Sequence, residues 1–378
     1  MKPIVVPSAF NDLCRHFDHD MEFLYPSFDF AVAAALGGMD EGKRGAIRDF
    51  LDEILDGSHS PEALAKMWTE TPAQYGLAPA SAVVEALETI HRFTRKDRAK
   101  QSEPQGLEGR RVLITGAGSG LGRAMSLALL SQGAKVALTS VDLPSLEETI
   151  RESGMAEDKA LALAGDLAVE DDIHAISRQA LEAFGGIDIL INNAGLGPQS
   201  IRPHGPGEAI SFREMSGATL ERFFKVNAVA PHLLTVDLVA GMIERGWGRV
   251  INISTSLDTM LKQVGYGASK AANEAYAAMM AQELAETGVT VNALLPGGPV
   301  NTPFAAGVDL PPHRMWQPEV MVPPLLWLCS TASDGLTGRR YLAAKWDETL
   351  LPDEAAALAG SPIAWTGYGP QAMLPPEN

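Results

Sequence analysis

The chain has 378 residues, 46% hydrophobic and 20% charged, which indicates a globular protein large enough for two domains and excludes a disordered or fibrous one. Its formal net charge of −17 argues against nucleic acid as a partner, because the average surface would repel phosphates. Cys14 and Cys329 are too few for a disulfide scaffold, and no apolar run resembles a signal peptide or reaches membrane-spanning length. We therefore expect a cytoplasmic protein that binds neither nucleic acid nor membrane.

Residues 1–105 show helical periodicity without strands and predict a small, mostly helical N-terminal domain. Its helix signals are apolar stripes with capping residues at their starts. They predict three helices: one that Asp40 caps and Gly57 ends, one that starts at Ser60-Pro61, and one from about Ser81 to Phe93. The polar, aperiodic residues 96–105 predict a linker.

The stretch His16-Phe-Asp-His-Asp20 carries histidine and aspartate side chains that metal sites also use. No further ligand pair accompanies it, so we predict no metal. Residues His16–Tyr25 resemble immunity proteins of contact-dependent growth inhibition systems, a resemblance that implies no activity for this chain. We interpret the helical domain as a docking or dimerisation module.

The stretch Val112–Arg123 is an apolar run followed by a turn rich in glycine. Apolar residues recur at helical spacing after the turn, so the turn joins a buried strand to a helix. A helix N-terminus presents unpaired N–H groups, and glycines let a pyrophosphate approach the backbone closely. Gly116, Gly120 and Gly122 therefore predict a phosphate-binding turn, although their spacing departs from the Gly-x-Gly-x-x-Gly fingerprint.

From Arg110 onward, short apolar runs alternate with helical segments, which is typical of a parallel sheet covered on both faces. After the first strand, six more are predicted at Val136–Thr139, Leu161–Ala164, Ile187–Ile191, Val250–Ile253, Val289–Leu294 and Arg340–Leu342. The fold class is thus α/β, a Rossmann-type doubly wound parallel sheet of about seven strands over residues 106–345. We interpret residues 346–378 as a tail that meanders over the surface.

Five segments of this half, in their order along the chain, resemble the short-chain dehydrogenase/reductase family: Thr115–Gly122, Asn192–Gly195, Asn227, Tyr266–Lys270 and Pro296-Gly297. The resemblance covers about residues 108–345. It implies an NAD(P)-dependent oxidoreductase that acts on a CH–OH group and interconverts a secondary alcohol and a ketone by hydride transfer. It also implies a homodimer or homotetramer.

Tyr266 and Lys270 lie four residues apart at the start of a predicted helix, so their side chains share one face. A phenol has a pKa near ~10, and a neighbouring ammonium favours the phenolate. We therefore expect Lys270 to lower the pKa of Tyr266 and to orient the cofactor ribose. A hydride transfer needs such an acid/base, because the proton on the substrate oxygen must move as well.

The resemblance implies a hydroxyl residue that binds the substrate oxygen about thirteen residues before the tyrosine. Strand register places Thr255 there, eleven residues before Tyr266, and Ser254 is the second candidate. Either hydroxyl donates and accepts hydrogen bonds. Asn227 matches the family's helix asparagine, for which the resemblance implies a water that relays protons to the lysine.

Asp166, beyond the third strand, is predicted to accept a hydrogen bond from the adenine amino group. The small residues of the Asn192–Gly195 segment let backbone lie along the flat cofactor. The predicted cofactor contacts are Gly116, Ser119, Gly120, Leu121, Gly122, Ser140, Asp166, Leu167, Asn193, Ala194, Gly195, Tyr266, Lys270, Pro296, Gly297, Val300 and Thr302. Neutral Ser140 at the end of the second strand favours NADP over NAD, whereas Asp142, at the spacing of a ribose-binding acid, favours NAD.

Two variable loops, Leu196–Gly217 and Phe304–Met321, are predicted to surround the substrate. Their apolar lid would comprise Phe304, His313, Met315 and Trp316. Only isolated arginines (Arg202, Arg213 and Arg314) occur in them, so we expect a small neutral alcohol or ketone. The alternative is a non-catalytic protein that binds a nicotinamide cofactor and acts as a sensor or a partner-binding platform.

Overall fold

The computed structural model describes residues 4–95, 106–156, 158–201, 210–306, 308 and 310–364. The chain forms two compact units, the first from residues 1–103 together with those from 347 onward, and the second from residues 104–346. The predicted linker at 96–105 lies outside the described residues.

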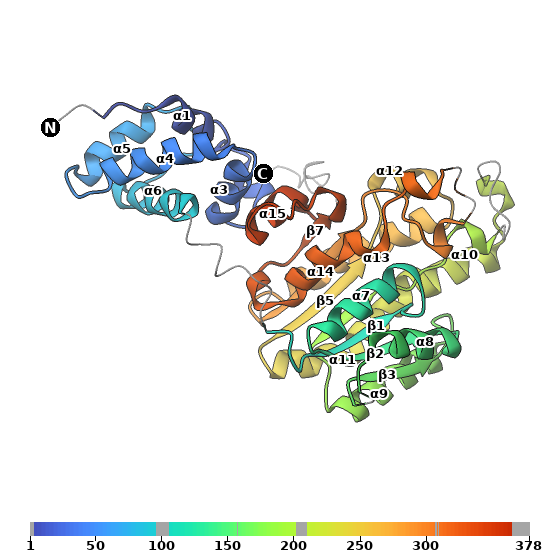
Figure 1. Ribbon diagram of the computed structural model, residues 1–378. Helices are drawn as coiled ribbons and strands as arrows, with labels where there is room; N and C mark the ends of the chain where they lie inside the picture. The colour runs from blue at the N-terminus through green and yellow to red at the C-terminus, as the bar shows by residue number, and fades with distance from the viewer. Residues whose placement is uncertain are drawn as a thin grey trace, which may run out of the picture. The chain divides into compact units, whose positions relative to one another are not determined.

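The first unit is helical (Figure 1). Its helices are α1 (Ser8–Cys14), α2 (Met21–Leu24), α3 (Phe28–Gly37), α4 (Glu41–Ile54), α5 (Pro61–Thr69), α6 (Ala80–Thr94) and α15 (Pro352–Ala359), and the short strand β8 (Gly360–Pro362) follows α15. The three predicted helices correspond to α4, α5 and α6. Asp40 Oδ1 accepts from the Lys43 amide at 2.9 Å, and Ser60 Oγ accepts from the Ala63 amide at 3.3 Å, as capping residues do.

The last described segment differs from the predicted surface tail. Its helix α15 packs against α3, and a Cβ added at Gly37 of α3 would lie 2.8 Å from Leu358 Cδ1. Glu354 is buried and forms an ion pair with Arg44 at 2.9 Å. Four alanines and a paired carboxylate let the two helices approach closely, so residues 347–364 belong to the first unit.

The second unit is a parallel sheet with helices on both faces. Its strands are β1 (Arg111–Thr115), β2 (Lys135–Ser140), β3 (Ala160–Ala164), β4 (Ile189–Asn192), β5 (Gly248–Ile253), β6 (Val289–Leu295) and β7 (Arg339–Leu342). They follow the spatial order β3-β2-β1-β4-β5-β6-β7, and every one of these pairings is parallel. The predicted fold class and all seven predicted strands are therefore confirmed.

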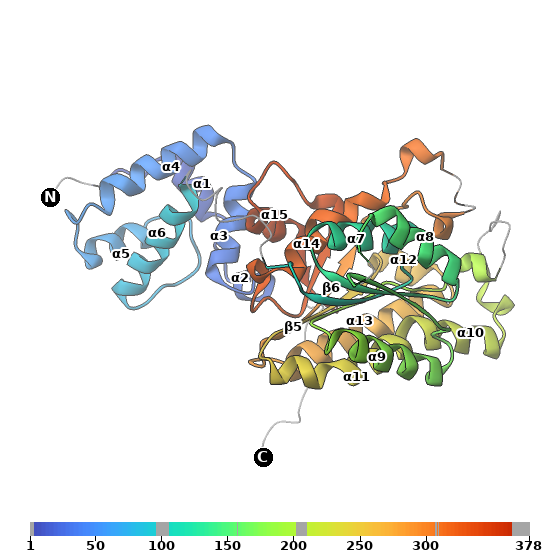
Figure 2. The same ribbon diagram turned by 60° about the horizontal axis from the view of Figure 1, so that its bottom comes forward.

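Eight helices of this unit connect the strands or flank the site: α7 (Gly120–Ser131), α8 (Leu143–Ser153), α9 (Glu170–Phe184), α10 (Gly217–Phe224), α11 (Ala230–Glu244), α12 (Leu257–Lys262), α13 (Tyr266–Glu283) and α14 (Val322–Cys329). Figure 2 shows α7, α8 and α14 on one face of the sheet and α9, α11 and α13 on the other. The chain changes face between β1 and β4, which are neighbours in the sheet. Ligands of such sheets bind at this switch point, beyond the carboxyl ends of the strands.

One helical stretch, Gly217–Glu244, is long and apolar enough to cross a membrane, with a mean hydropathy of 1.5 in its most apolar window. From the sequence, no apolar run of this length is expected. The stretch arises because α10, a π-helical turn (Lys225–Val229) and α11 continue as one helix. Half of the window is buried, and α11 packs on α9, α13 and three strands, as the core helix of a globular unit does.

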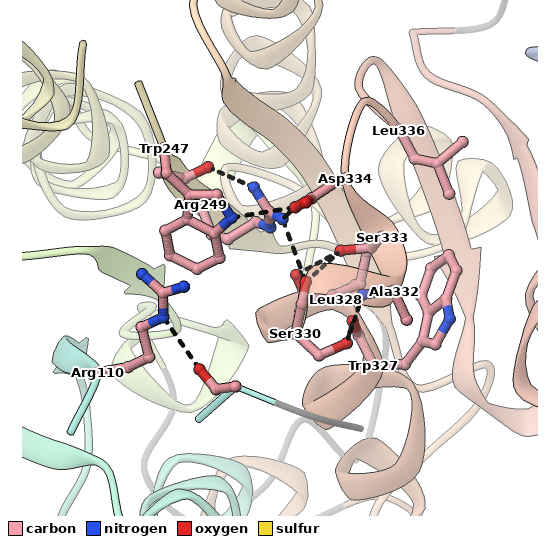
Figure 3. A network of polar contacts seen from close by, with 12 residues as sticks. Arg110, Trp247, Arg249, Trp327, Leu328, Ser330, Ala332, Ser333, Asp334 and Leu336 are labelled. Carbon is pink, nitrogen blue, oxygen red and sulfur yellow. Dashed lines mark hydrogen bonds and ion pairs between the residues drawn. The ribbon is translucent and has the colours of Figure 1, made fainter. Parts of the chain in front are cut away.

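Charged and aromatic side chains pack together at the amino end of β5 (Figure 3). The guanidinium groups of Arg110 and Arg249 lie 3.7 and 4.2 Å from the ring centre of Trp247. Arg249 donates to Asp334 and, at 3.1 Å, to the carbonyl of Ser330, and Trp247 Nε1 donates to Asp334 at 3.0 Å. Burial lowers the pKa of Arg249, and its bond to Asp334 opposes that shift. The contacts anchor the sheet at the end away from the switch point.

Candidate active site

A cavity of about 560 Å³ opens at the carboxyl ends of the strands, at the switch point. Every predicted cofactor contact lines it, and so do four of the five predicted catalytic residues. Asn227 is the exception. The lining also includes polar residues outside the recognised motifs, among them Gln199, Arg222, Thr259 and Gln263. No motif marks these four, because they come from helices and loops without a recognisable spacing.

The glycine turn forms the floor of the cavity at the start of α7. Gly116 and Gly120 have positive φ angles of 65° and 51°, which favour glycine. A Cβ at Gly122 would lie 2.0 Å from the carbonyl oxygen of Gly116, so no side chain fits. Asn193 Nδ2 donates to the carbonyls of Thr115 and Gly116 at 2.9 and 3.1 Å, which fixes the turn.

The first turn of α7 has no side-chain cap. Ser119 occupies the N-cap position, and its hydroxyl makes no capping hydrogen bond. The amide groups of this turn are therefore available to an anion, and the helix dipole favours one there. A cradle that excludes side chains and offers backbone donors fits the pyrophosphate of a dinucleotide.

The ends of β2 and β3 form a second part of the cavity. Asp166 Oδ1 accepts from the Ala168 amide at 2.9 Å, and Oδ2 accepts from Arg222 at 3.1 Å. Ser140 also lines the cavity, whereas Asp142 stands at the N-cap position of α8, outside the lining and without a side-chain capping bond. Asp166, already paired with Arg222, is the one carboxylate among the lining residues that the structure describes.

Tyr266, Lys270 and Thr255 all line the cavity. Tyr266 and Lys270 lie one turn apart on α13, and the hydroxyl of Tyr266 is hydrogen bonded to the side chain of Thr255. Lys270 Nζ donates to the carbonyl of Ile253 at 2.7 Å and lies 6.0 Å from the centre of the Tyr266 ring. A phenol, a hydroxyl and an ammonium therefore share one wall.

Burial governs the protonation of both titratable groups. It raises the pKa of Tyr266 to about 12, against the lowering effect of the Thr255 hydrogen bond. It lowers the pKa of Lys270 to about 8. The expectation that Lys270 lowers the pKa of Tyr266 is wrong for this structure, because the ammonium is held on the Ile253 carbonyl and the phenol is desolvated. Tyr266 is a protonated acid at neutral pH.

The two candidate hydroxyls point to different partners. Ser254 Oγ donates to Glu274 Oε2 at 2.8 Å inside the protein, whereas Thr255 bonds Tyr266. The register that ranked Thr255 first thus agrees with the geometry of the phenol. Ser254 also lines the cavity, but its hydroxyl proton is donated to the buried carboxylate of Glu274.

Asn227 lies in the π-helical turn and is fully buried. Its Oδ1 accepts from the Leu196 amide at 2.7 Å, and its Nδ2 donates to Ser269 Oγ at 2.9 Å. Its main-chain oxygen accepts from Asn273 Nδ2 at 2.7 Å. These contacts join the chain beyond β4 to α13, so in this structure Asn227 positions the wall of the cavity rather than lining it.

The chain beyond β6 covers the cavity. A Cβ at Gly120 would lie 2.9 Å from Thr302 Cγ2, so Thr302 approaches the glycine turn closely. The Phe304 ring lies 5.4 Å from the Tyr266 ring. Of the predicted lid, only Phe304 lines the cavity, and the prediction is wrong for His313, Met315 and Trp316. The Trp316 backbone pairs with Val300 and its indole packs beside Gly298, which keeps Trp316 out of the cavity.

The arginines of the two loops stay out of the cavity where the structure describes them. Arg213 and Arg314 are absent from the lining, and Arg202 lies outside the described residues. No group of three or more histidine, cysteine, aspartate or glutamate side chains is arranged to hold a metal within the described part of the chain, the His16–Asp20 stretch included.

A glycine turn at the start of a helix, placed where the strand order reverses, defines a dinucleotide-binding protein of the doubly wound α/β class. Residues 110–310 match the family model described as short chain dehydrogenase. The chain belongs to the short-chain dehydrogenase/reductase family of oxidoreductases. The matched residues leave the helical unit aside, so the resemblance of His16–Tyr25 to immunity proteins stays a prediction.

Relatives and solved structures agree with this assignment. The 3-oxoacyl-acyl-carrier-protein reductase FabG of Aquifex aeolicus is 30% identical over 61% of this chain and 94% of its own length. The uncharacterized oxidoreductase YhxC of Bacillus subtilis is 31% identical over 65% and 86%. The 3-ketoacyl-(acyl-carrier-protein) reductase of Brucella melitensis, solved with NADH, covers 63% of this chain and 97% of its own at 30% identity and a TM-score of 0.55.

A metagenomic short-chain oxidoreductase, solved in complex with NADP, also has this fold, with a TM-score of 0.51 and 28% identity. It covers 62% of this chain and 97% of its own. The structural neighbours thus include one with NADH and one with NADP.

Proposed function

We propose that the protein interconverts a secondary alcohol and a ketone by hydride transfer, with NAD(P) as the cofactor. The observation that carries the proposal is that Tyr266, Thr255 and Lys270 line the same cavity as the glycine turn. Reduction of a carbonyl needs a hydride donor for the carbon and a proton donor for the oxygen. A dinucleotide-binding turn beside two hydroxyl side chains can provide both.

The chain's own groups have separate parts in this reaction. NAD(P)H, held by the glycine turn, Asp166, and the segment from Pro296 to Thr302, supplies the hydride when bound. Tyr266 gives its proton to the substrate oxygen as the carbonyl carbon is reduced, and takes that proton back in the reverse direction. Thr255 donates a hydrogen bond to the same oxygen. Lys270 holds the ribose and restores the proton of Tyr266.

We favour NADP over NAD as the cofactor. Ser140 at the end of β2 is neutral, Asp142 lies outside the lining, and Asp166 is already paired with Arg222. The cavity therefore presents no free carboxylate to repel a 2′-phosphate among its described residues.

The substrate we propose is a small neutral alcohol or ketone. The cavity lining includes the apolar residues Leu196, Pro198, Phe304 and Val308, together with Gln199 and Gln263. Arg222 and Lys270 are the cations among the described lining residues; Arg222 bonds Asp166, and the mechanism assigns Lys270 to the ribose, so neither is left for an anionic substrate. Two similar proteins are named reductases of 3-oxoacyl groups, which supports a ketone carbonyl as the reacting group.

A homodimer or homotetramer in the cytoplasm completes the proposal. Apolar side chains are exposed on α11 and α13, namely Val236, Ile243, Tyr276 and Met279. Such side chains on two adjacent helices favour an interface with a second copy.

A fluorescence titration with NADH and NADPH, followed by NADPH oxidation with ethyl acetoacetate, cyclohexanone and acetophenone, tests the proposal. We expect saturable binding, tighter for NADPH, and turnover of at least one ketone. Binding without any turnover would favour a sensor or partner-binding protein instead. A failure to bind either nucleotide contradicts both functions.

A further inference from the structure

A carboxylate buried in the second unit contacts the end of β5. Glu274 lies on α13 one turn after Lys270, and its side chain is 0% exposed. Its Oε2 accepts from Ser254 Oγ at 2.8 Å, and Arg340 Nε lies 3.4 Å from its Oε1. Neither Glu274 nor Arg340 lines the cavity, so the proposed proton transfer does not use them directly.

Arg340 connects this ion pair to the active site. It lies on β7, is 14% exposed at its side chain, and donates from Nη2 to the main-chain oxygen of Thr255 at 2.9 Å. The side chain of the same threonine is hydrogen bonded to Tyr266. The guanidinium thus holds Glu274 with one nitrogen and the backbone of Thr255 with another.

Two consecutive residues at the end of β5 are therefore fixed by one buried pair, Ser254 through its hydroxyl and Thr255 through its carbonyl. Burying two charges costs desolvation free energy, and this cost cancels most of the attraction between them. The pair therefore adds little to the net stability of the fold. What the pair does supply is orientation, because the fork of an arginine sets the angle between its two partners.

We propose that Glu274 and Arg340 are positioning residues, which aim the hydroxyl of Thr255 at the substrate oxygen by fixing the backbone from Ser254 to Thr255. This proposal rests on the function proposed above. It requires the two residues to act through Thr255, so their effect on turnover exists only while the threonine hydroxyl is present.

A double-mutant cycle tests this coupling in the full chain. The substitution Arg340→Lys keeps the positive charge but loses the forked guanidinium. We compare kcat with and without this substitution, both in the wild type and in Thr255→Ala. The substrates are NADPH and a ketone that the wild type reduces. We expect Arg340→Lys to lower kcat about tenfold in the wild type and less than about twofold in Thr255→Ala. The dissociation constant for NADPH should stay within about twofold in all four proteins.

A second variant tests the same role if Arg340→Lys fails to fold. Glu274→Gln/Arg340→Met removes both charges together, leaves no unpaired ion, and should fold while losing the bond to the Thr255 carbonyl. It should lower kcat as much as Arg340→Lys does. The matched control is Arg178→Lys on the exposed side of α9, which should change neither kcat nor the midpoint of thermal unfolding.

The outcomes separate the two proposals. If the wild type reduces none of the ketones, the proposed function fails and the positioning role fails with it. If the wild type turns over and Arg340→Lys lowers kcat equally in both backgrounds, or in neither, the positioning role alone is overturned.

Discussion

The two ends of the same sheet bury cations in different ways. At the amino end Arg249, 1% exposed, has a carboxylate partner in Asp334 and an aromatic face in Trp247. At the carboxyl end Lys270 is buried to a similar degree, yet its one described hydrogen bond is to a carbonyl, and its pKa falls to about 8. A buried cation with a counter-charge is held in one state, whereas one without it is free to change its charge near physiological pH.

The largest expected effect is a loss of catalysis, without a loss of stability, at the carboxyl end of the sheet. Tyr266→Phe removes the proton donor and should lower kcat by about 10²–10⁴-fold, with NADPH affinity and the thermal midpoint unchanged. Steady-state kinetics, fluorescence titration and calorimetry measure the three quantities. Tyr276→Phe, on the same helix but outside the cavity, keeps its aromatic ring and is the control, which should leave kcat unchanged. Turnover retained by Tyr266→Phe would remove this residue from the mechanism.

The amino end should show the opposite pattern. Asp334→Ala removes the half-exposed carboxylate that bonds buried Arg249, so the free energy of unfolding should fall by about 1.5–3 kcal/mol, as urea denaturation measures it. Specific activity of the folded enzyme should stay unchanged, because this cluster lies away from the cavity. The control is Asp258→Ala, whose side chain is 72% exposed and should cost less than about 0.5 kcal/mol. A comparable loss of unfolding free energy in both variants would mean that Asp334 does not stabilise the buried charge of Arg249 through the contacts in Figure 3.

Lys270 should lower stability in a pH-dependent way. Because its pKa falls from 10.5 to about 8 on folding, the unfolded chain binds the extra proton between these values, so the free energy of unfolding rises with pH in that window. Below pH 8 the cost of the buried charge is complete. Lys270→Met should therefore be more stable than the wild type at pH 7, by roughly 1–3 kcal/mol, and this difference should shrink towards pH 10.

Urea denaturation at pH 7 and pH 9.5 measures the stability difference for Lys270. Lys66→Met is the control, since its side chain is 79% exposed. A Lys270→Met protein that is less stable than the wild type at pH 7 would mean that the bond to the Ile253 carbonyl outweighs the cost of burial.

The smallest effect concerns the cofactor. Ser140→Asp places a carboxylate at the end of β2, where it should repel a 2′-phosphate and raise the dissociation constant of NADPH about tenfold, with less change for NADH. Ser131→Asp, at the exposed end of α7, should change neither constant. Equal weakening of both nucleotides would show that Ser140 does not face the 2′ position.

Sequence patterns predicted the elements that have a periodic or capping signal. Apolar runs with glycine turns identified all seven strands of the second unit, and Asp40 and Ser60 marked helix starts that the structure confirms. The helix α3 was missed because Phe30 to Leu36 are all buried, so no polar face reveals a helical period. The helix α15 was missed for a related reason, since its alanines suit a close helix contact and carry little pattern of their own.

The site was predictable where a motif fixes the backbone and less so where side-chain environment decides. The glycine turn and the separation of Tyr266 from Lys270 follow from spacing, and the structure brings these residues to one cavity. The choice between Ser254 and Thr255 depends on Glu274, a partner twenty residues beyond Ser254, and the direction of the Tyr266 pKa shift depends on burial. Neither can be read from residue types alone.

The packing of α15 against α3 has a consequence for synthesis on the ribosome. Because α15 follows the whole second unit in the chain, the face of α3 that contacts it stays uncovered while more than 300 further residues are translated. Arg44 is without its ion-pair partner Glu354 over the same interval. The dehydrogenase unit can mature first, and the helical unit that begins earlier is completed later, so a nascent chain halted before residue 347 would carry a finished catalytic unit and an incomplete helical one.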